Sequence, residues 1–241
     1  MRFRKSDKIQ FISTVEGLET TEECLPRPAK YFIPEWFKNI PSKVEDLASV
    51  KYCPSFPDYF SQGYILPMWT DVKLKADKNN WNWETPTSKV IWDAHPNIQF
   101  LNYVDASFNG VKGQHVFKSE CPWRIITPPG WSVLQLPLFY NFNQEWSVLP
   151  GVIDTDIHSI INQQVLYHGD GKEVEIKMGD PFVLYIPFKR SNKLKHKILY
   201  QTDEHKKSFN EQDIKFFQKF RPNGVYRNLQ RKRDKKGSGG L

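Results

Sequence analysis

Two carboxylates and an imidazole stand at alternate positions of the segment LPGVIDTDIHS. If residues Val152–His158 form a strand, its two-residue period places Asp154, Asp156 and His158 on one face. Such a set resembles the oxygen and nitrogen ligands that hold Fe(II) or Mn(II) with open positions for a substrate. The outer members would lie about 13 Å apart, so at most two adjacent members can bind one ion. Other strands would then supply the remaining ligands from His168, His95 or His115. A solvated polar face is the alternative interpretation.

Two cations follow the apolar stretch Phe182–Phe188, which has the composition of a buried strand. Lys189 and Arg190 would stand at the mouth of a barrel, where a cation could bind a carboxylate or a phosphate. Exposed lysine and arginine are also usual where strands end in solvent. The pair is therefore a candidate anion-binding site, with an ordinary surface as the alternative.

Trp81 and Trp83 come directly after the polar group Asp77–Asn80, an arrangement typical of a hairpin. Both indoles then point to one face, where they could stack on sugars or bases. Packing in the core is the alternative, because large aromatic side chains dominate burial in β domains.

The formal net charge of +7 is unevenly distributed along the chain. Residues 1–188 contain 18 Lys/Arg and 22 Asp/Glu, whereas residues 189–241 contain 16 and 5, so all the excess lies near the C-terminus. A basic tail could contact nucleic-acid phosphates without sequence preference, and a solubilising terminus is the alternative. The cations considered for this role are Arg227, Arg231, Lys232, Arg233, Lys235 and Lys236.

Short stretches rich in aromatic and β-branched residues recur along the chain, with Gly, Pro or Asn at most junctions. No helical pattern alternates with them, which disfavours a parallel α/β sheet. We predict a mainly β fold, an antiparallel sandwich or a double-stranded β-helix of the cupin or jelly-roll type, with a few short helices and one C-terminal helix. The predicted strands are 65–76 with an interruption at Pro67, 89–92, 98–104, 114–118, 123–127, 132–140, 146–149, 152–158, 174–177 and 182–188.

The predicted organisation has three parts. Residues 1–29 form an N-terminal arm, residues 30–222 a single β-rich domain, and residues 223–241 a basic disordered tail. Ser208 and Glu211 form an S-x-x-E capping box, which predicts the C-terminal helix over about residues 209–220.

The cysteines and the hydropathy pattern predict a cytoplasmic protein without membrane contact. Cys24, Cys53 and Cys121 are odd in number and widely spaced, which fits neither a disulfide framework nor a CxxC zinc site. No apolar run approaches the roughly 18 residues of a membrane span, and the segment MRFRKSDKIQF lacks the apolar stretch of a signal peptide.

Two resemblances bear on function. The stretch EVEIKMGDPFVLYIPFKR resembles the Gly-Asp turn and following proline of double-stranded β-helix proteins at Gly179, Asp180 and Pro187, but the His-x-His and Glu ligands of cupins are missing. The run PWRIITPPGWSVLQLPLF, followed by VLPGVIDTDIH and MGDPFVLYIPFKR, resembles an uncharacterised family encoded by tailed, especially marine, bacteriophages. That resemblance covers roughly residues 30–190 and implies a viral origin without an activity.

Three function classes follow from these patterns. The first is a phage-encoded, non-catalytic β domain that binds a virion or host protein through its β surface, or nucleic acid through the basic tail, and needs no cofactor. The alternative is a cupin-like oxygenase that holds Fe(II) or Mn(II) with Asp154 or Asp156 and one or two histidines. The third is a carbohydrate-binding module that uses Trp81 and Trp83.

Overall fold

The computed structural model describes residues 8–45, 47–77, 80–89, 92–104, 107–108, 111–112, 115–190 and 197–217. The chain forms two compact units. The first comprises Met1–Pro34 with Ser61–Asn192, and the second comprises Glu35–Phe60 with Lys193–Leu241.

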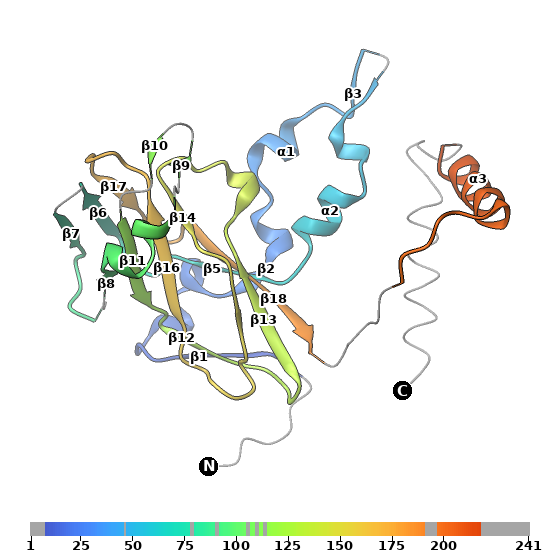
Figure 1. The fold of residues 1–241 in the computed structure, drawn as a ribbon. Coiled ribbons are helices and arrows are strands. Elements are labelled where there is room, and N and C mark those ends of the chain that lie inside the picture. Colours follow the sequence, from blue (N-terminus) through green and yellow to red (C-terminus); the bar gives the residue numbers. More distant parts are fainter. Residues whose placement is uncertain are drawn as a thin grey trace. The chain divides into compact units, whose positions relative to one another are not determined.

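The first unit contains two antiparallel sheets in a sandwich-like arrangement, which confirms the predicted mainly β class (Figure 1). One sheet has the order β14-β16-β11-β8 and the other β15-β13-β18-β5-β2. The strands of the first are β14 (Trp146–Val148), β16 (Asn162–Tyr167), β11 (His115–Glu120) and β8 (Trp92–His95). Those of the second are β15 (Gly151–Ile153), β13 (Trp131–Leu136), β18 (Pro181–Lys189), β5 (Tyr64–Pro67) and β2 (Arg27–Pro28).

Smaller antiparallel pairings complete the unit. The hairpin predicted around Asp77–Asn80 is confirmed, because the strands before and after it pair and Asn80 N–H donates to the Asp77 side chain. The strands are β17 (Val174–Ile176), β6 (Val72–Ala76) and β7 (Trp81–Glu84) in one sheet, β1 (Gln10–Ser13) with β12 (Trp123–Ile126), and β9 (Ser107–Phe108) with β10 (Val111–Lys112).

The N-terminal segment lies in the first unit, where the sequence predicts an arm. β1 pairs with β12 over four residues, and Phe11 packs against the core. Leu18 and Cys24 are themselves buried core residues. Apolar burial therefore holds this segment in place from Gln10 onward.

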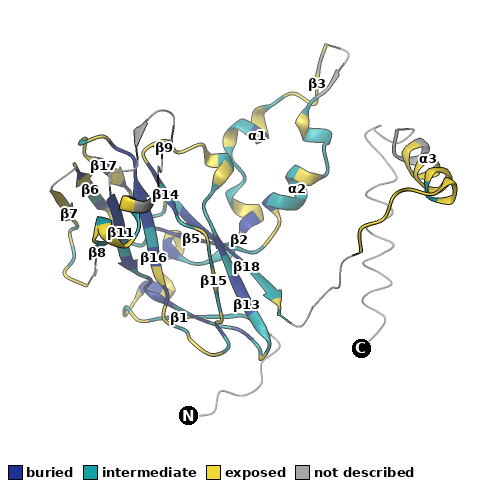
Figure 2. Ribbon diagram, viewed as in Figure 1, coloured by how far each residue is buried: buried dark blue, intermediate teal, exposed yellow. Residues whose placement is uncertain are grey.

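The core lies between the two sheets, and the buried residues of β11, β16 and β18 are coloured dark blue in Figure 2. A buried chain of hydrogen bonds crosses it. Gln163 of β16 donates to the Tyr185 hydroxyl of β18 at 3.1 Å, and that hydroxyl donates to Gln135 of β13 at 2.8 Å. The Gln135 amide in turn donates to the carbonyl of Leu149 at 2.9 Å. The chain satisfies polar groups that burial would otherwise destabilise, and it joins the two sheets.

Several predicted strands end or form differently. Residues 98–104, predicted as a strand, form instead the 3₁₀ helices η5 (Asn97–Gln99) and η6 (Leu101–Tyr103), which follow Pro96. β13 ends at Leu136, before Pro137, and η7 (Phe139–Asn141) follows it. The interruption predicted at Pro67 is confirmed, because β5 ends there opposite a register shift in β18. The remaining 3₁₀ helices of this unit are η1 (Leu18–Thr20), η2 (Glu22–Cys24) and η3 (Ala29–Phe32).

The second unit has a small aromatic cluster. Phe37 is buried and stacks on Phe56 with ring centroids 5.9 Å apart, while Phe60 meets it edge-on at 4.8 Å. The elements are α1 (Glu35–Asn39), β3 (Lys43–Val44), β4 (Leu47–Ala48), η4 (Val50–Tyr52), α2 (Ser55–Phe60) and α3 (Asp203–Phe217).

The C-terminal helix begins earlier than predicted. Thr202 caps α3, because its hydroxyl accepts from His205 N–H at 3.3 Å while its own N–H donates to the His205 ring at 3.2 Å. This reciprocal cap makes Ser208 an interior residue, and the predicted end at residues 218–220 lies outside the described residues. Within the described part of the chain, no helix is both long and apolar enough to cross a membrane.

All three cysteines carry free thiols. Burial raises the pKa of Cys24 to about 11 and that of Cys121 to about 12, so both stay protonated at neutral pH.

Candidate functional site

The segment that carries the predicted metal ligands is a turn and not a strand. β15 ends at Ile153, and the amides of Ile157 and His158 then donate to the carbonyl of Asp154 at 3.0 and 2.9 Å. The chain therefore reverses at the point where the predicted strand would continue. The prediction that Asp154, Asp156 and His158 share one strand face is wrong.

A proline-glycine turn between β12 and β13 faces this segment. Pro128–Trp131 closes with a hydrogen bond from Trp131 N–H to the Pro128 carbonyl at 3.1 Å. Gly130 has a φ of 83°, the left-handed conformation that a type II turn requires at its third position. Its N–H donates to a carboxylate oxygen of Asp156 at 2.7 Å, which joins the two turns.

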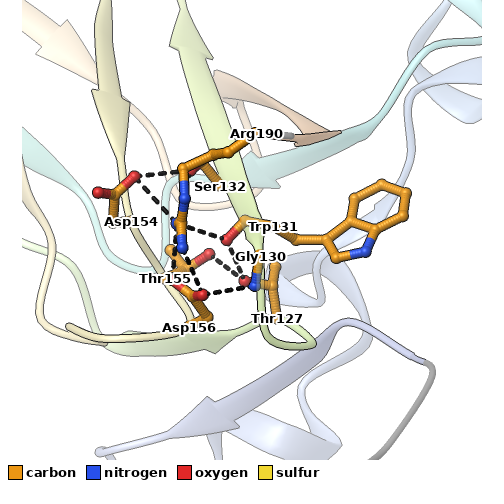
Figure 3. A network of polar contacts seen from close by, with 8 residues as sticks. All are labelled: Thr127, Gly130, Trp131, Ser132, Asp154, Thr155, Asp156 and Arg190. Carbon is orange, nitrogen blue, oxygen red and sulfur yellow. Dashed lines mark hydrogen bonds and ion pairs between the residues drawn. The ribbon is translucent and has the colours of Figure 1, made fainter. Parts of the chain in front are cut away.

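Arg190, the residue after β18, binds Asp156 through two parallel hydrogen bonds. Its two terminal nitrogens lie 2.7 and 2.6 Å from the two carboxylate oxygens (Figure 3). The Asp156 side chain is 7% exposed, so this fork is largely shielded from water. The hydrogen bonds from Arg190, and then the one from Gly130, hold the pKa of Asp156 below its usual value. The same pair raises the pKa of Arg190.

Asp154 also contacts this guanidinium, through its terminal nitrogen Nη1 (Figure 3). Its carboxylate lies 3.1 Å from Nη1 of Arg190 and accepts a hydrogen bond from the Ser132 hydroxyl at 2.6 Å. Arg190 Nη1 also donates to the Ser132 hydroxyl at 2.9 Å and to the Trp131 carbonyl at 3.1 Å. One cation therefore connects β13, the turn after β15 and the end of β18.

Two threonines close the network. The hydroxyls of Thr127 and Thr155 lie 2.7 Å apart, and Thr127 also donates to the Trp131 carbonyl at 3.0 Å. We call residues 154–160 the braced loop, because its first three residues are fixed by these contacts.

The network bears directly on the predicted anion site. Arg190 does hold carboxylates, but they belong to its own chain, and two negative groups neutralise one positive group. Lys189 is exposed beside it. Binding of an added phosphate or carboxylate at Lys189 and Arg190 stays a prediction.

The predicted histidine ligands are placed apart from this network. His158 is exposed, whereas His168 is buried, with its ring 3.4 Å from the Ser147 hydroxyl at β14. Burial lowers the pKa of His168. Among the residues that the structure describes, no three His, Cys, Asp or Glu side chains form a group able to hold a metal ion. A metal bound by Asp154 and Asp156 would have to displace Arg190.

The chain matches no family model and no curated protein. Its resemblance to a protein family encoded by tailed, especially marine, bacteriophages therefore stays a prediction.

The two predicted stacking residues have different environments. Trp81 is 42% exposed and stacks on His115 at 5.7 Å, while Trp83 packs against the core. The predicted nucleic-acid residues Arg227, Arg231, Lys232, Arg233, Lys235 and Lys236 lie outside the described residues.

The exposed apolar residues in and beside the braced loop could not be recognised from the sequence. Ile157 is 79% exposed, and Val152 and Ile160 on either side of it are also exposed. Isoleucine between a turn aspartate and a histidine gives no sign of exposure by itself. The available signal is the proline-glycine turn, which predicts a tight connection at this end of the sheet.

Proposed function

We propose that the first unit is a non-catalytic recognition domain that binds a partner protein through the braced loop. The observation that carries this proposal is the combination of a loop fixed by Arg190 with an isoleucine, Ile157, whose side chain is mostly in water. Exposed apolar side chains that are grouped together mark interaction surfaces. Val152 and Ile160, on either side of Ile157 in the sequence, are exposed as well.

The contacts that fix the braced loop reduce the loss of conformational entropy when a partner binds. A flexible loop loses conformational freedom when a partner orders it, and this loss weakens the complex. The backbone around Asp154 and Asp156 is already ordered by the fork to Arg190 and by the Gly130 N–H. Ile157 therefore meets a partner with little further ordering of the backbone.

The charge of this part of the chain favours a protein partner over a polyanion. Residues 125–171 contain no lysine or arginine and four acidic residues. Nucleic acids and anionic membranes are bound chiefly by clusters of cations. Beside the braced loop, Arg190 is already paired with two carboxylates, and the exposed Lys189 is a single cation. The complementary surface is an apolar pocket with hydrogen-bond donors or cations at its rim, next to Asp154. The phage resemblance suggests that the partner protein with this surface is a virion or host protein.

The test compares three full-length proteins in affinity capture from bacterial extract, followed by titration with the purified captured protein. They are the natural chain, Ile157→Asp, and the matched control Ile98→Asp, since Ile98 is also exposed in the first unit. We expect one protein to bind the natural chain and the control, and to bind Ile157→Asp about 100-fold more weakly, because a carboxylate would be buried in an apolar pocket.

The proposal fails if no captured protein shows this pattern. It also fails if Ile157→Asp and Ile98→Asp weaken binding equally.

A further inference from the structure

A second exposed feature lies at the other end of β13. The segment from Phe139 to Glu145 connects β13 to β14, and we call it the aromatic loop. In the β13–β15 ladder, Val133 lies opposite Ile153 near the braced loop, whereas Gln135 lies opposite Gly151 near the aromatic loop. The two loops are thus separated by the length of β13, about 17 Å.

Three aromatic rings gather in this loop. Phe139 is 64% exposed and Phe142 is 55% exposed. Tyr140 meets Phe139 edge-on at 5.3 Å and Phe142 edge-on at 6.2 Å. Edge-to-face packing holds the rings at fixed mutual angles and leaves two apolar ring surfaces largely in water.

The backbone also fixes the ring positions. Phe142 has a φ of 52°, a left-handed conformation that is rare for a bulky residue, and its N–H donates to the Phe139 carbonyl at 3.2 Å. The Asn143 side chain accepts from the N–H groups of Glu145 and Trp146 at 2.8 and 3.1 Å, which ties the loop to β14. An unfavourable residue conformation kept at an exposed aromatic side chain is typical of a binding feature.

The polar side chains between the rings indicate the ligand class. Asn141, Asn143 and Gln144 are exposed, and Glu145 follows them. Amide side chains both donate and accept hydrogen bonds, as hydroxyl groups do, and a carboxylate accepts from hydroxyls. The loop lies inside the segment without lysine or arginine, so it lacks the groups that bind phosphates or sulfates. Apolar ring surfaces beside amides match the apolar faces and hydroxyl edges of sugar rings.

We propose that the aromatic loop binds neutral carbohydrate, with Phe139 and Phe142 against sugar faces and Asn141 and Gln144 on hydroxyl groups. This goes beyond the proposed function, because the loop lies at the other end of β13 from the braced loop and takes a different class of ligand. It also differs from the predicted sugar contact at Trp81 and Trp83.

The test is saturation-transfer NMR of the full-length protein with defined neutral oligosaccharides of glucose, mannose, galactose and N-acetylglucosamine. We expect at least one oligosaccharide to give a signal. The double variant Phe139→Ala and Phe142→Ala should bind that oligosaccharide about tenfold or more weakly. Phe142→Gly is the second variant. It should weaken binding but keep or raise the melting temperature, because glycine accepts the left-handed conformation without strain.

Trp81→Ala, which removes another exposed aromatic ring, is the matched control and should leave the signal unchanged. The proposal is overturned if none of the oligosaccharides gives a signal, or if loss of Trp81 abolishes the signal while the Phe variants keep it. It is also overturned if the Phe variants lose a protein partner and no sugar.

Discussion

At Asp156, one carboxylate holds together segments that are distant in the sequence. It accepts from Gly130 and from both terminal nitrogens of Arg190. Hydrogen bonds to a charged group are stronger than those between neutral groups, and here the acceptor is nearly buried. The residue is therefore a structural support of the braced loop, although its type and position first suggested a metal ligand.

Asp156→Asn should lower the free energy of unfolding by about 2 kcal/mol at pH 7, because a neutral amide cannot accept the same pair of charged hydrogen bonds. The pKa of Asp156 is lowered in the folded protein, so its stabilising contribution is complete above the unfolded pKa of about 4 and is lost as the pH falls through the folded value. Urea titrations from neutral to acidic pH should show the difference between variant and natural chain shrinking below about pH 4.

Asp93→Asn is a suitable control for this measurement, since Asp93 is exposed on β8. It should change stability little at any pH. An Asp156→Asn effect that persists unchanged at acidic pH would contradict the role given to the ion pair.

At the scale of elements, the buried hydroxyl of Tyr185 joins strands of the two main sheets. Tyr185→Phe removes the partner of Gln163 and one partner of Gln135. Two buried amides then lose hydrogen bonds, and we expect a loss of about 2–3 kcal/mol in the free energy of unfolding by urea titration.

Tyr64 stands opposite Tyr185 in the ladder of β18 and β5 but is only half-buried, so Tyr64→Phe is the matched control. The double variant Tyr185→Phe and Gln163→Met should be less destabilised than the sum of the single variants, because the second change removes an amide that the first had left unsatisfied. Strict additivity would mean that the chain of hydrogen bonds does not act as a unit.

The sequence predicts most strands whose apolar residues alternate or run together. β11, β12, β14, β17 and β18 all fall within two residues of their predicted bounds. It fails where a side chain or a turn decides the local conformation. β15 stops at Ile153 because two amides turn back to the Asp154 carbonyl. α3 starts at Asp203 because Thr202 and His205 form a reciprocal cap in which histidine takes the position that Glu or Gln usually has.

The sequence singled out Asp154 and Asp156 as metal ligands and Arg190 as an anion-binding residue, but it did not predict that they contact one another. Asp154, Asp156 and Arg190 are all close together, but 34 residues separate Asp156 from Arg190, and no local pattern reports that contact. β16 was missed because its first three residues, Asn162 to Gln164, are polar. Its register with β11 is set by tertiary packing instead.

At the scale of the whole molecule, the charge is segregated along the chain, with all the excess cations after residue 188. Removing residues 225–241 deletes six lysines and arginines. If the tail contacts phosphates, the full-length protein should bind duplex DNA with a slope of log affinity against log salt steeper by about 5 than that of the truncated protein.

Titration of both proteins with the same duplex at low and moderate salt measures this difference. A full-length variant with the six cations replaced by glutamine separates charge from chain length. Unchanged binding after truncation would remove nucleic acid from the tail's possible partners.

β18 is the last strand of the first unit along the chain, yet it lies between β13 and β5 in the five-stranded sheet. A growing chain that has not reached Lys189 therefore leaves both neighbours with open edges, and such edges invite pairing with other chains. Until β18 has left the ribosome, the pair β15 and β13 and the pair β5 and β2 cannot join into one sheet. At least residues 190–241 follow that strand, so β18 can leave the ribosome and insert while later residues are still being added.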